Sequence, residues 1–254
     1  MPAGPRIPGF DAAGVIVAVG SGVADWKPGD EVIAFSDRTG AYAEYLAVPV
    51  DAITAKPAEL TFEEAAGIPT VAYAVWAVLV DIADVKAGDR VLVHGASGGT
   101  GSAAVQIAKA RGAWVIATAS RQNHDYVRSL GADEMIDYRN ERFEDRAKDI
   151  DIVFNNVDTD TANRSISVVR PGGIIVSITG TIDQDRVAAA GIRASGRVPG
   201  GTPVGEVLRQ VARLASEGKY DVNVDSRFSL DQVNEAWAHS RDGSPRGKII
   251  ITLP

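Results

Sequence analysis

The chain has 254 residues, no cysteine and a formal net charge of -7, with 45% hydrophobic and 23% charged residues. This length gives enough volume for one large domain or two small ones, and the composition is that of a globular protein. The negative charge disfavours binding to nucleic acid, which requires a basic surface. The absence of cysteine excludes disulfides, thiolate zinc sites and cysteine nucleophiles.

We expect neither an export signal nor a membrane span from the sequence. No apolar run approaches the roughly 18 residues needed to span a bilayer. The first ten residues, MPAGPRIPGF, lack the apolar segment of a signal peptide. The histidines, His94, His124 and His239, lie far apart and do not have the spacing of metal ligands. We therefore expect a cytoplasmic protein that holds no metal and binds neither membrane nor nucleic acid.

The first 75 residues favour short strands and turns. Strands are predicted over 13–19, 31–35 and 41–48, and a type II turn over 27–30, where Pro28 precedes Gly29. Thr61 is expected to begin a helix, because Glu63 and Glu64 in its first turn would stabilise the positive end of the helix dipole.

From about Val85 onward, strands alternate with helices of about ten residues. Strands are predicted over 90–94, 114–119, 151–155 and 173–178, and helices over 101–111, 123–130 and 160–169. This alternation is typical of βαβ units and predicts an α/β fold with a doubly wound parallel sheet. Four later elements are predicted, namely helices over 204–215 and 230–240 and strands over 222–228 and 248–253. The last strand is expected to pair with the β-rich start of the chain.

A glycine-rich loop joins the first strand of this sheet to its helix. The stretch VLVHGASGGTGSAAVQIAKARG contains Gly95, Gly98 and Gly101 at the spacing of a dinucleotide-binding loop. The first glycine makes the turn, the second lets a pyrophosphate approach, and the third allows the helix to pack on the strand. The other candidate cofactor-binding residues in the loop are Ser97, Gly99 and Thr100. A turn with a helix cap and no ligand is the alternative interpretation.

The end of the next strand bears on which cofactor binds. NAD-binding proteins usually carry an acidic residue there for the ribose 2′-hydroxyl. This chain has Ser120 and Arg121, and no carboxylate occurs before Asp125. A hydroxyl and a guanidinium suit a 2′-phosphate, which favours NADP(H) over NAD(H). His124 is a candidate for a further phosphate contact. In the alternative, Ser120 caps the following helix and Arg121 is a solvated charge.

Several stretches together resemble the medium-chain dehydrogenase/reductase superfamily, in its zinc-free quinone oxidoreductase branch. In chain order they are PGFDAAGVIVAVGSGV, WKPGDEVIAF, GAYAEY, VLVHGASGGTG, LGADEMIDYR, VRPGGIIVSITG and RGKIIITL. The resemblance implies a GroES-like β-rich catalytic domain over 1–75 and 221–254, and a Rossmann domain over 76–220. It also implies hydride transfer from NADPH to a quinone or an α,β-unsaturated carbonyl.

The resemblance further places Tyr138 near the adenosine phosphate. Val157, from the loop after strand 151–155, and Thr179 and Gly180, from the SITG stretch, complete the candidate cofactor-binding residues. Zinc-dependent relatives use a Cys and a His-Glu pair, where this chain has no Cys and reads Pro8-Gly9-Phe10-Asp11. His94 is expected to support the loop, and catalytic residues remain unassigned.

The chain departs from the family pattern at the nicotinamide side of the site. The usual Leu-Thr-Ala-Trp signature reads Tyr73-Ala74-Val75-Trp76, so Ala74 replaces a threonine that contacts the nicotinamide. The usual Asp-x-Val-Gly-Gly reads Asn155-Asn156-Val157-Asp158-Thr159. These changes leave open a non-redox descendant of the fold, such as a cyclase, a lyase or a nucleotide-sensing protein.

The β-rich domain is expected to be shortened, because relatives extend further before the PGFD stretch. Missing strands would expose sheet edges and apolar side chains, which a second copy of the chain can cover. Relatives often dimerise through the last Rossmann strand, but here the stretch from Ser195 to Gly201 contains Pro199, which cannot donate a ladder hydrogen bond. We therefore expect a small-molecule substrate and a homodimer formed through the β-rich domain.

Overall fold

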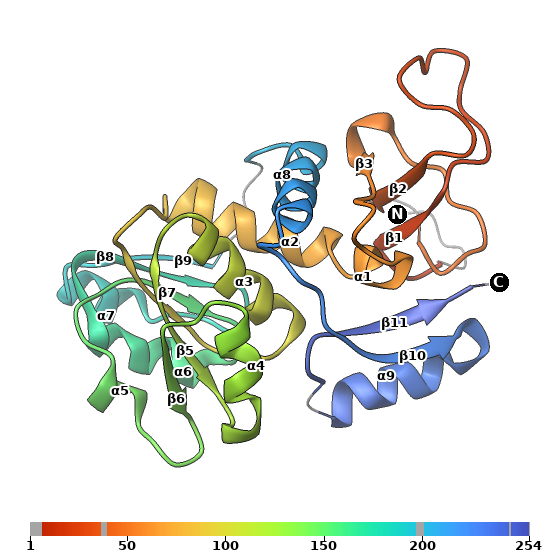
Figure 1. The fold of residues 1–254 in the computed structure, drawn as a ribbon. Coiled ribbons are helices and arrows are strands. Elements are labelled where there is room, and N and C mark those ends of the chain that lie inside the picture. The colour runs from red at the N-terminus through yellow and green to blue at the C-terminus, as the bar shows by residue number, and fades with distance from the viewer. Residues whose placement is uncertain (1–6, 37–39, 197–200, 244, 254) are drawn as a thin grey trace. The chain divides into compact units, whose positions relative to one another are not determined.

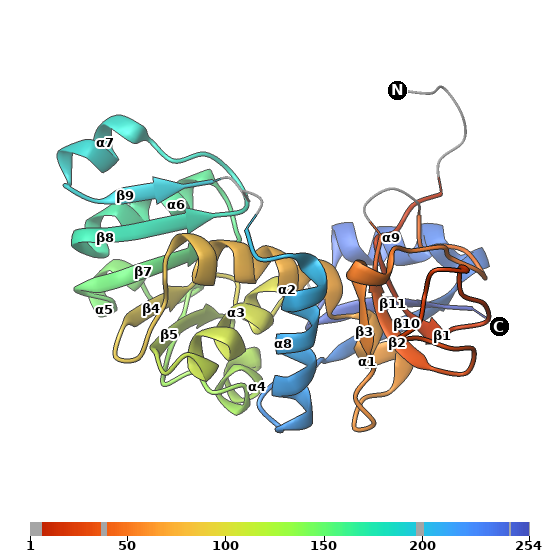
Figure 2. The same cartoon turned by 90° about the horizontal axis from the view of Figure 1, so that it is seen from above.

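The computed structural model describes residues 7–36, 40–196, 201–243 and 245–253. The chain forms two compact units, and each is described by itself (Figure 1). Unit 1 comprises residues 1–73 and 203–254, and unit 2 comprises residues 74–202. The helix predicted over 204–215, which the sequence grouped with the Rossmann domain, lies in unit 1. It is α8 (Val204–Ser216), and it packs against β3 (Ile53–Ala55), as Figure 2 also shows.

Unit 2 is built on a six-stranded, fully parallel sheet with the strand order β6-β5-β4-β7-β8-β9. Its strands are β4 (Arg90–Val93), β5 (Trp114–Ala119), β6 (Glu134–Asp137), β7 (Ile150–Asn155), β8 (Val169–Ser177) and β9 (Arg193–Ser195). This is the 3-2-1-4-5-6 order of a doubly wound Rossmann sheet. The predicted fold class is therefore confirmed, and β6 and β9 are strands that the sequence pattern did not reveal.

Helices connect these strands in the alternating manner expected. They are α3 (Gly99–Ala110), α4 (His124–Ser129), α5 (Phe143–Arg146), α6 (Thr159–Ser165) and α7 (Gln184–Ala189). A π-helix, η2 (Trp76–Ile82), continues directly from α2 (Pro69–Val75). Short 3-10 turns, η3 (Arg121–Asn123) and η4 (Ile166–Val168), flank α4 and α6 and account for the outer turns of the predicted helices.

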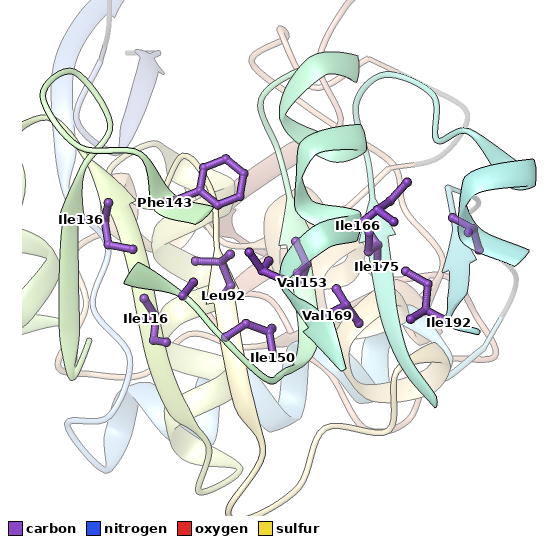
Figure 3. Packing of buried hydrophobic residues seen from close by; sticks show 13 residues of the cluster. Leu92, Ile116, Ile136, Phe143, Ile150, Val153, Ile166, Val169, Ile175 and Ile192 are labelled. Carbon is purple, nitrogen blue, oxygen red and sulfur yellow. The ribbon is translucent and has the colours of Figure 1, made fainter. Parts of the chain in front are cut away.

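One apolar cluster of unit 2 lies on the face of the sheet covered by α5, α6 and α7, and Val91, Val93 and Val115, at the alternate positions of the same strands, are fully buried as well. Apolar side chains from β4 to β8 form a continuous row along the sheet, with Phe143 and Ile166 packed over them (Figure 3). Leu92, Ile116, Val153 and Ile175 are fully buried. Strands covered on both faces are expected to read as short apolar runs, which is the pattern seen in VLV and IDIVF. This packing holds the carboxyl ends of the central strands in place.

Unit 1 contains two small sheets. β1 (Asp11–Val15), β2 (Glu31–Phe35) and β3 form an antiparallel sheet, and β10 (Val224–Ser229) pairs in parallel with β11 (Lys248–Thr252). The helix α9 (Val233–Asp242) packs against β10 and β11. Thr61 caps α1 (Phe62–Ala66) in a capping box with Glu64, which confirms the predicted helix start.

Two expectations for unit 1 were wrong. The late strand 248–253 pairs with β10, and the two sheets stay separate, so it does not complete the sheet at the start of the chain. Residues 41–48 form no strand. Ala41 N and Tyr42 N donate hydrogen bonds to the carbonyl oxygens of Gly9 and Pro8, both at 3.0 Å, and the Tyr42 ring packs against Gly9. Pro8 has no N–H to return a ladder bond, so the pairing ends there.

Candidate functional site

The candidate dinucleotide site lies at the carboxyl ends of β4 and β7. These neighbouring strands are where the strand order of the sheet reverses, and ligands of doubly wound proteins bind at that point. The loop after β4 begins with Gly95, and the loop after β7 contains Asn156 and Val157. A Cβ atom on Gly95 would lie 3.3 Å from Val157 Cγ2 and 3.5 Å from the Asn156 carbonyl oxygen. The two loops therefore meet at the switch point.

The three glycines of the first loop have different surroundings. Gly95 has a φ of +69°, a region that favours glycine. A Cβ on Gly101 would overlap the Gly95 carbonyl and come within 2.8 Å of Ala96 Cα, so only glycine fits there. Among the described residues, a Cβ on Gly98 would come within 4 Å of only the Gly95 carbonyl oxygen, at 3.7 Å. The protein leaves the space beside Gly98 open, which is the condition for a pyrophosphate to approach.

Helix α3 begins at this open space. Its N-cap is Gly98, which offers no side chain to the helix end, and its first bond to the cap runs from Ser102 N to Gly98 O at 2.8 Å. The first N–H groups of a helix have no partner within it, and here they belong to Gly99, Thr100 and Gly101. An anion is favoured at such an end. These residues fit the pyrophosphate of a dinucleotide.

The second candidate region follows β5. Ser120 is buried, and its hydroxyl accepts a hydrogen bond from Asn123 Nδ2 at 3.3 Å. The side chain of Arg121 is exposed. Tyr138, which follows the neighbouring strand β6, is 57% exposed. Arg121 and Tyr138 are therefore both accessible to a ligand at the carboxyl ends of β5 and β6. Ser120 supports the turn that follows β5.

His124 does not reach the surface. It is 3% exposed, and its Nε2 atom lies 3.2 Å from the Ala119 carbonyl oxygen. Its Nδ1 atom has no hydrogen-bond partner among the described residues. The structure therefore places this ring under the β5 loop rather than beside Arg121 on the outside.

Sequence reasoning missed a buried carboxylate at this end of the site. Asp137 is the last residue of β6 and lies opposite Ala119 in the sheet. It accepts hydrogen bonds from Asn140 Nδ2 at 2.7 Å and from Arg139 N at 3.2 Å. The Asn140 bond, helped by the Arg139 and Arg121 backbone and by the nearby His124, lowers the pKa of the Asp137 carboxyl. Strand order brings Asp137 to Arg121, which sequence spacing could not show.

Asn155 organises the loops after β7 and β8. Its fully buried side-chain amide donates to Ser177 Oγ at 2.8 Å, to Asp158 O at 3.0 Å and to Thr179 O at 3.3 Å. Gly180 has a φ of +71°, and a Cβ there would lie 2.6 Å from Thr159 N. Asn155, at the position of the family's aspartate, therefore has a structural role in this chain.

Asp11 and Tyr73, which occur in the stretches that resemble the family or depart from it, have structural partners in unit 1. Asp11 begins β1, and its carboxylate accepts hydrogen bonds from Thr70 N at 2.9 Å and Thr70 Oγ1 at 2.5 Å. The ring of Tyr73 packs against that of Phe35, with 5.8 Å between the centroids. Tyr45, in the stretch 41–48 that was predicted as a strand, is 74% exposed and lies in an irregular segment.

Two further observations concern the described part of the chain. Within it, no group of three or more histidine or acidic side chains is placed to hold a metal ion. None of its helices is long and apolar enough to cross a membrane. Of the edge stretch from Ser195 to Gly201, residues 197–200 lie outside the described residues.

Known families match both parts of the chain. Residues 1–58 match the alcohol dehydrogenase GroES-like domain, and residues 130–251 match the zinc-binding dehydrogenase family. The quinone oxidoreductase of Pongo abelii is 34% identical over 98% of this chain and 80% of its own length. An NADPH-dependent alkenal/one oxidoreductase of Arabidopsis thaliana is 35% identical over 97% of this chain. The chain spans 64% of the length of that plant protein.

Solved structures agree with these matches. An alcohol dehydrogenase superfamily protein from Novosphingobium aromaticivorans has a TM-score of 0.91 at 33% identity, covering 98% of this chain and 83% of its own. The quinone oxidoreductase from Coxiella burnetii has a TM-score of 0.87 at 31% identity, covering 99% and 81%. The chain belongs to the medium-chain dehydrogenase/reductase superfamily, within which its relatives include quinone oxidoreductases and enoyl reductases.

Proposed function

We propose that the protein is an NADPH-dependent oxidoreductase that reduces a quinone or an α,β-unsaturated carbonyl compound, without a metal. The observation that carries this proposal is the unfilled space beside Gly98, at the start of α3 and at the switch point of the sheet. Two relatives support the reaction class, because one is a quinone oxidoreductase and the other an alkenal/one oxidoreductase.

Different residues would bind different parts of the cofactor. The N–H groups of Gly99, Thr100 and Gly101 would hold the pyrophosphate, and the guanidinium of Arg121 would pair with the 2′-phosphate. NADPH would supply the hydride when bound. The protein's task is to orient the dinucleotide. Asn155 contributes by fixing the loops after β7 and β8, on the other side of the switch point from Arg121.

The preference for NADPH rests on Arg121, since the carboxylate of Asp137 is already engaged by Asn140 and Arg139. Arg121→Ala should lose about 1.5–3 kcal/mol of NADPH affinity, the scale of a hydrogen bond to a charged group. NADH affinity should stay nearly unchanged. Calorimetry with both cofactors checks this, and Arg213→Ala, which removes an exposed arginine from α8 in unit 1, is the matched control. Equal losses for the two cofactors would contradict the 2′-phosphate assignment.

The reaction is tested by following NADPH oxidation with quinones and with α,β-unsaturated ketones and aldehydes as acceptors. Turnover of either class is the expected result. Tight NADPH binding with no oxidation by any acceptor would instead indicate a non-redox descendant of the fold.

We also propose that the protein forms a homodimer through unit 1. The support is the apolar surface along β1 and the segment after it, where Phe10, Val15 and Val17 are exposed. Among the described strands, β1 pairs only with β2, which leaves its other edge open. Light scattering at micromolar concentration should give twice the mass of the chain, and a stable monomer would rule out this interface.

A further inference from the structure

A buried histidine immediately precedes the glycine loop and contacts side chains from β5, α5 and α6. His94 follows β4, is 1% exposed, and packs edge-on against Phe143 with 4.6 Å between the ring centroids. Its Nδ1 atom lies 3.2 Å from Thr118 Oγ1 on β5, and its Nε2 atom lies 3.0 Å from Ser165 Oγ on α6. Both ring nitrogens are therefore hydrogen-bonded to hydroxyl groups, one on β5 and one on α6.

The hydrogen bonds around His94 have a defined direction. Ser165 Oγ donates to the Thr161 carbonyl oxygen at 2.7 Å, so its proton is used and it must accept from the ring. The proton of His94 is thus on Nε2, and Nδ1 accepts from the Thr118 hydroxyl. Burial lowers the pKa of His94 to about 3, which keeps the ring neutral at physiological pH. One tautomer satisfies every partner.

The chain of bonds continues from Thr118 to the glycine loop. With its proton donated to His94, the Thr118 hydroxyl is oriented to accept from Gly95 N, at 3.4 Å. The Thr118 carbonyl accepts from Ala96 N at 3.1 Å. Thr118 therefore holds the first two residues of the loop, and His94 determines which way its hydroxyl points. On its other side, the His94 ring is hydrogen-bonded to Ser165 on α6. The N-cap of α6 is Asp158, in the loop after β7.

We propose that His94, as the neutral Nε2–H tautomer, is the positioning residue that sets the glycine loop for a dinucleotide pyrophosphate. This role rests on the proposed function, because it presumes that the loop holds the pyrophosphate. It reaches the ligand only through Thr118 and Gly95. Because the same ring is also hydrogen-bonded to Ser165 on α6, His94 connects the glycine loop after β4 with the helix that follows the loop after β7.

The test separates the loop from the adenosine end. Kd is measured for NADPH, which contains the pyrophosphate, and for 2′-AMP, which carries only the adenosine and its 2′-phosphate. His94→Phe keeps a ring and removes both polar atoms, and Thr118→Val removes only the hydroxyl. Each should weaken NADPH binding about tenfold and leave 2′-AMP binding unchanged, the scale of one neutral hydrogen bond. His94→Gln, which keeps a donor and an acceptor, should recover most of the affinity.

Nitrogen NMR of the wild-type protein without cofactor gives an independent measurement, which holds if His94→Phe fails to fold. The expected spectrum shows a protonated Nε2 and an unprotonated Nδ1. A protonated Nδ1 would overturn the proposal, as would wild-type NADPH affinity in Thr118→Val, or equal losses for NADPH and 2′-AMP. Wild-type protein that binds neither ligand would overturn the proposed function itself, an outcome that differs from all of these.

Discussion

The two ends of the candidate dinucleotide site are built in opposite ways. The glycine loop is shaped by backbone packing, since there is no room for a Cβ at Gly101 and Gly95 N donates a hydrogen bond to Thr118 Oγ1. The adenosine end presents the exposed side chains of Arg121 and Tyr138 on a turn. A packed loop binds through fixed N–H groups, whereas an exposed turn binds through charge. Substitutions should therefore affect folding at the first end and cofactor preference at the second.

The largest effect is expected from Gly101→Val. Its side chain would overlap the Gly95 carbonyl and the Ala96 backbone, which cannot move without opening the strand-to-helix turn. Overpacking of this kind should cost about 3 kcal/mol or more in the free energy of unfolding. Urea denaturation measures the loss. A variant as stable as the wild type would show that the loop is not closely packed.

Gly98→Val is the matched substitution three residues earlier. The protein offers its Cβ only one neighbour, 3.7 Å away, so the free energy of unfolding should change little. Dinucleotide binding should weaken at least about a hundredfold, because the branched side chain fills the space that a pyrophosphate needs. Calorimetry with NADPH checks this, with 2′-AMP as the ligand that should still bind. Normal NADPH affinity would exclude this loop as the phosphate site.

The pH dependence of stability probes the support under the loop. Burial lowers the pKa of His94 to about 3, with smaller contributions from the charges of Arg164, Glu144 and Asp158. Below about pH 6.5 this histidine is protonated in the unfolded chain but stays neutral in the folded protein. The free energy of unfolding therefore falls as the pH falls. One such group costs about 1.4 kcal/mol per pH unit, or about 2 kcal/mol at pH 5.

Urea unfolding of the wild type and His94→Gln at pH 7 and pH 5 isolates this contribution. The variant should lose about 2 kcal/mol less than the wild type over that interval, because glutamine does not titrate. The acidic groups whose pKa values are lowered, Asp137, Glu144 and Asp158, are present in both proteins and cancel in the difference. Identical pH slopes would mean that folding does not lower the pKa of His94.

The smallest effect is expected from Tyr138→Ala at the exposed end. The Tyr138 side chain is 57% exposed, and the Arg139 guanidinium lies 5.8 Å from the centroid of its ring. Its removal should leave the free energy of unfolding within about 0.5 kcal/mol of the wild type. NADPH affinity should fall about threefold, the scale of an exposed cation–π or stacking contact. A loss as large as that of Arg121→Ala would show that this end also depends on packing.

Much of the fold could be read from local sequence patterns. Alternating apolar strands and helices predicted the parallel sheet, and the Gly95, Gly98 and Gly101 spacing predicted a turn between a strand and a helix, both of which the structure contains. These features depend on residues close together in the chain, where backbone geometry and hydrophobic periodicity act directly. The same locality explains why Thr61 was recognised as a helix cap.

Tertiary structure decided which side chains meet. The pairing of β5 with β6 brings Asp137 to the turn that carries Arg121, and it leaves His124 beneath that turn. The pairing of β4 with β5 joins His94 to Thr118, 24 residues away. The missing N–H of Pro8 ends the pairing of residues 41–48, and contacts with β3 place α8 in unit 1. Strand order and packing determine all of these, because contacts between distant residues depend on the arrangement of whole elements and not on spacing along the chain.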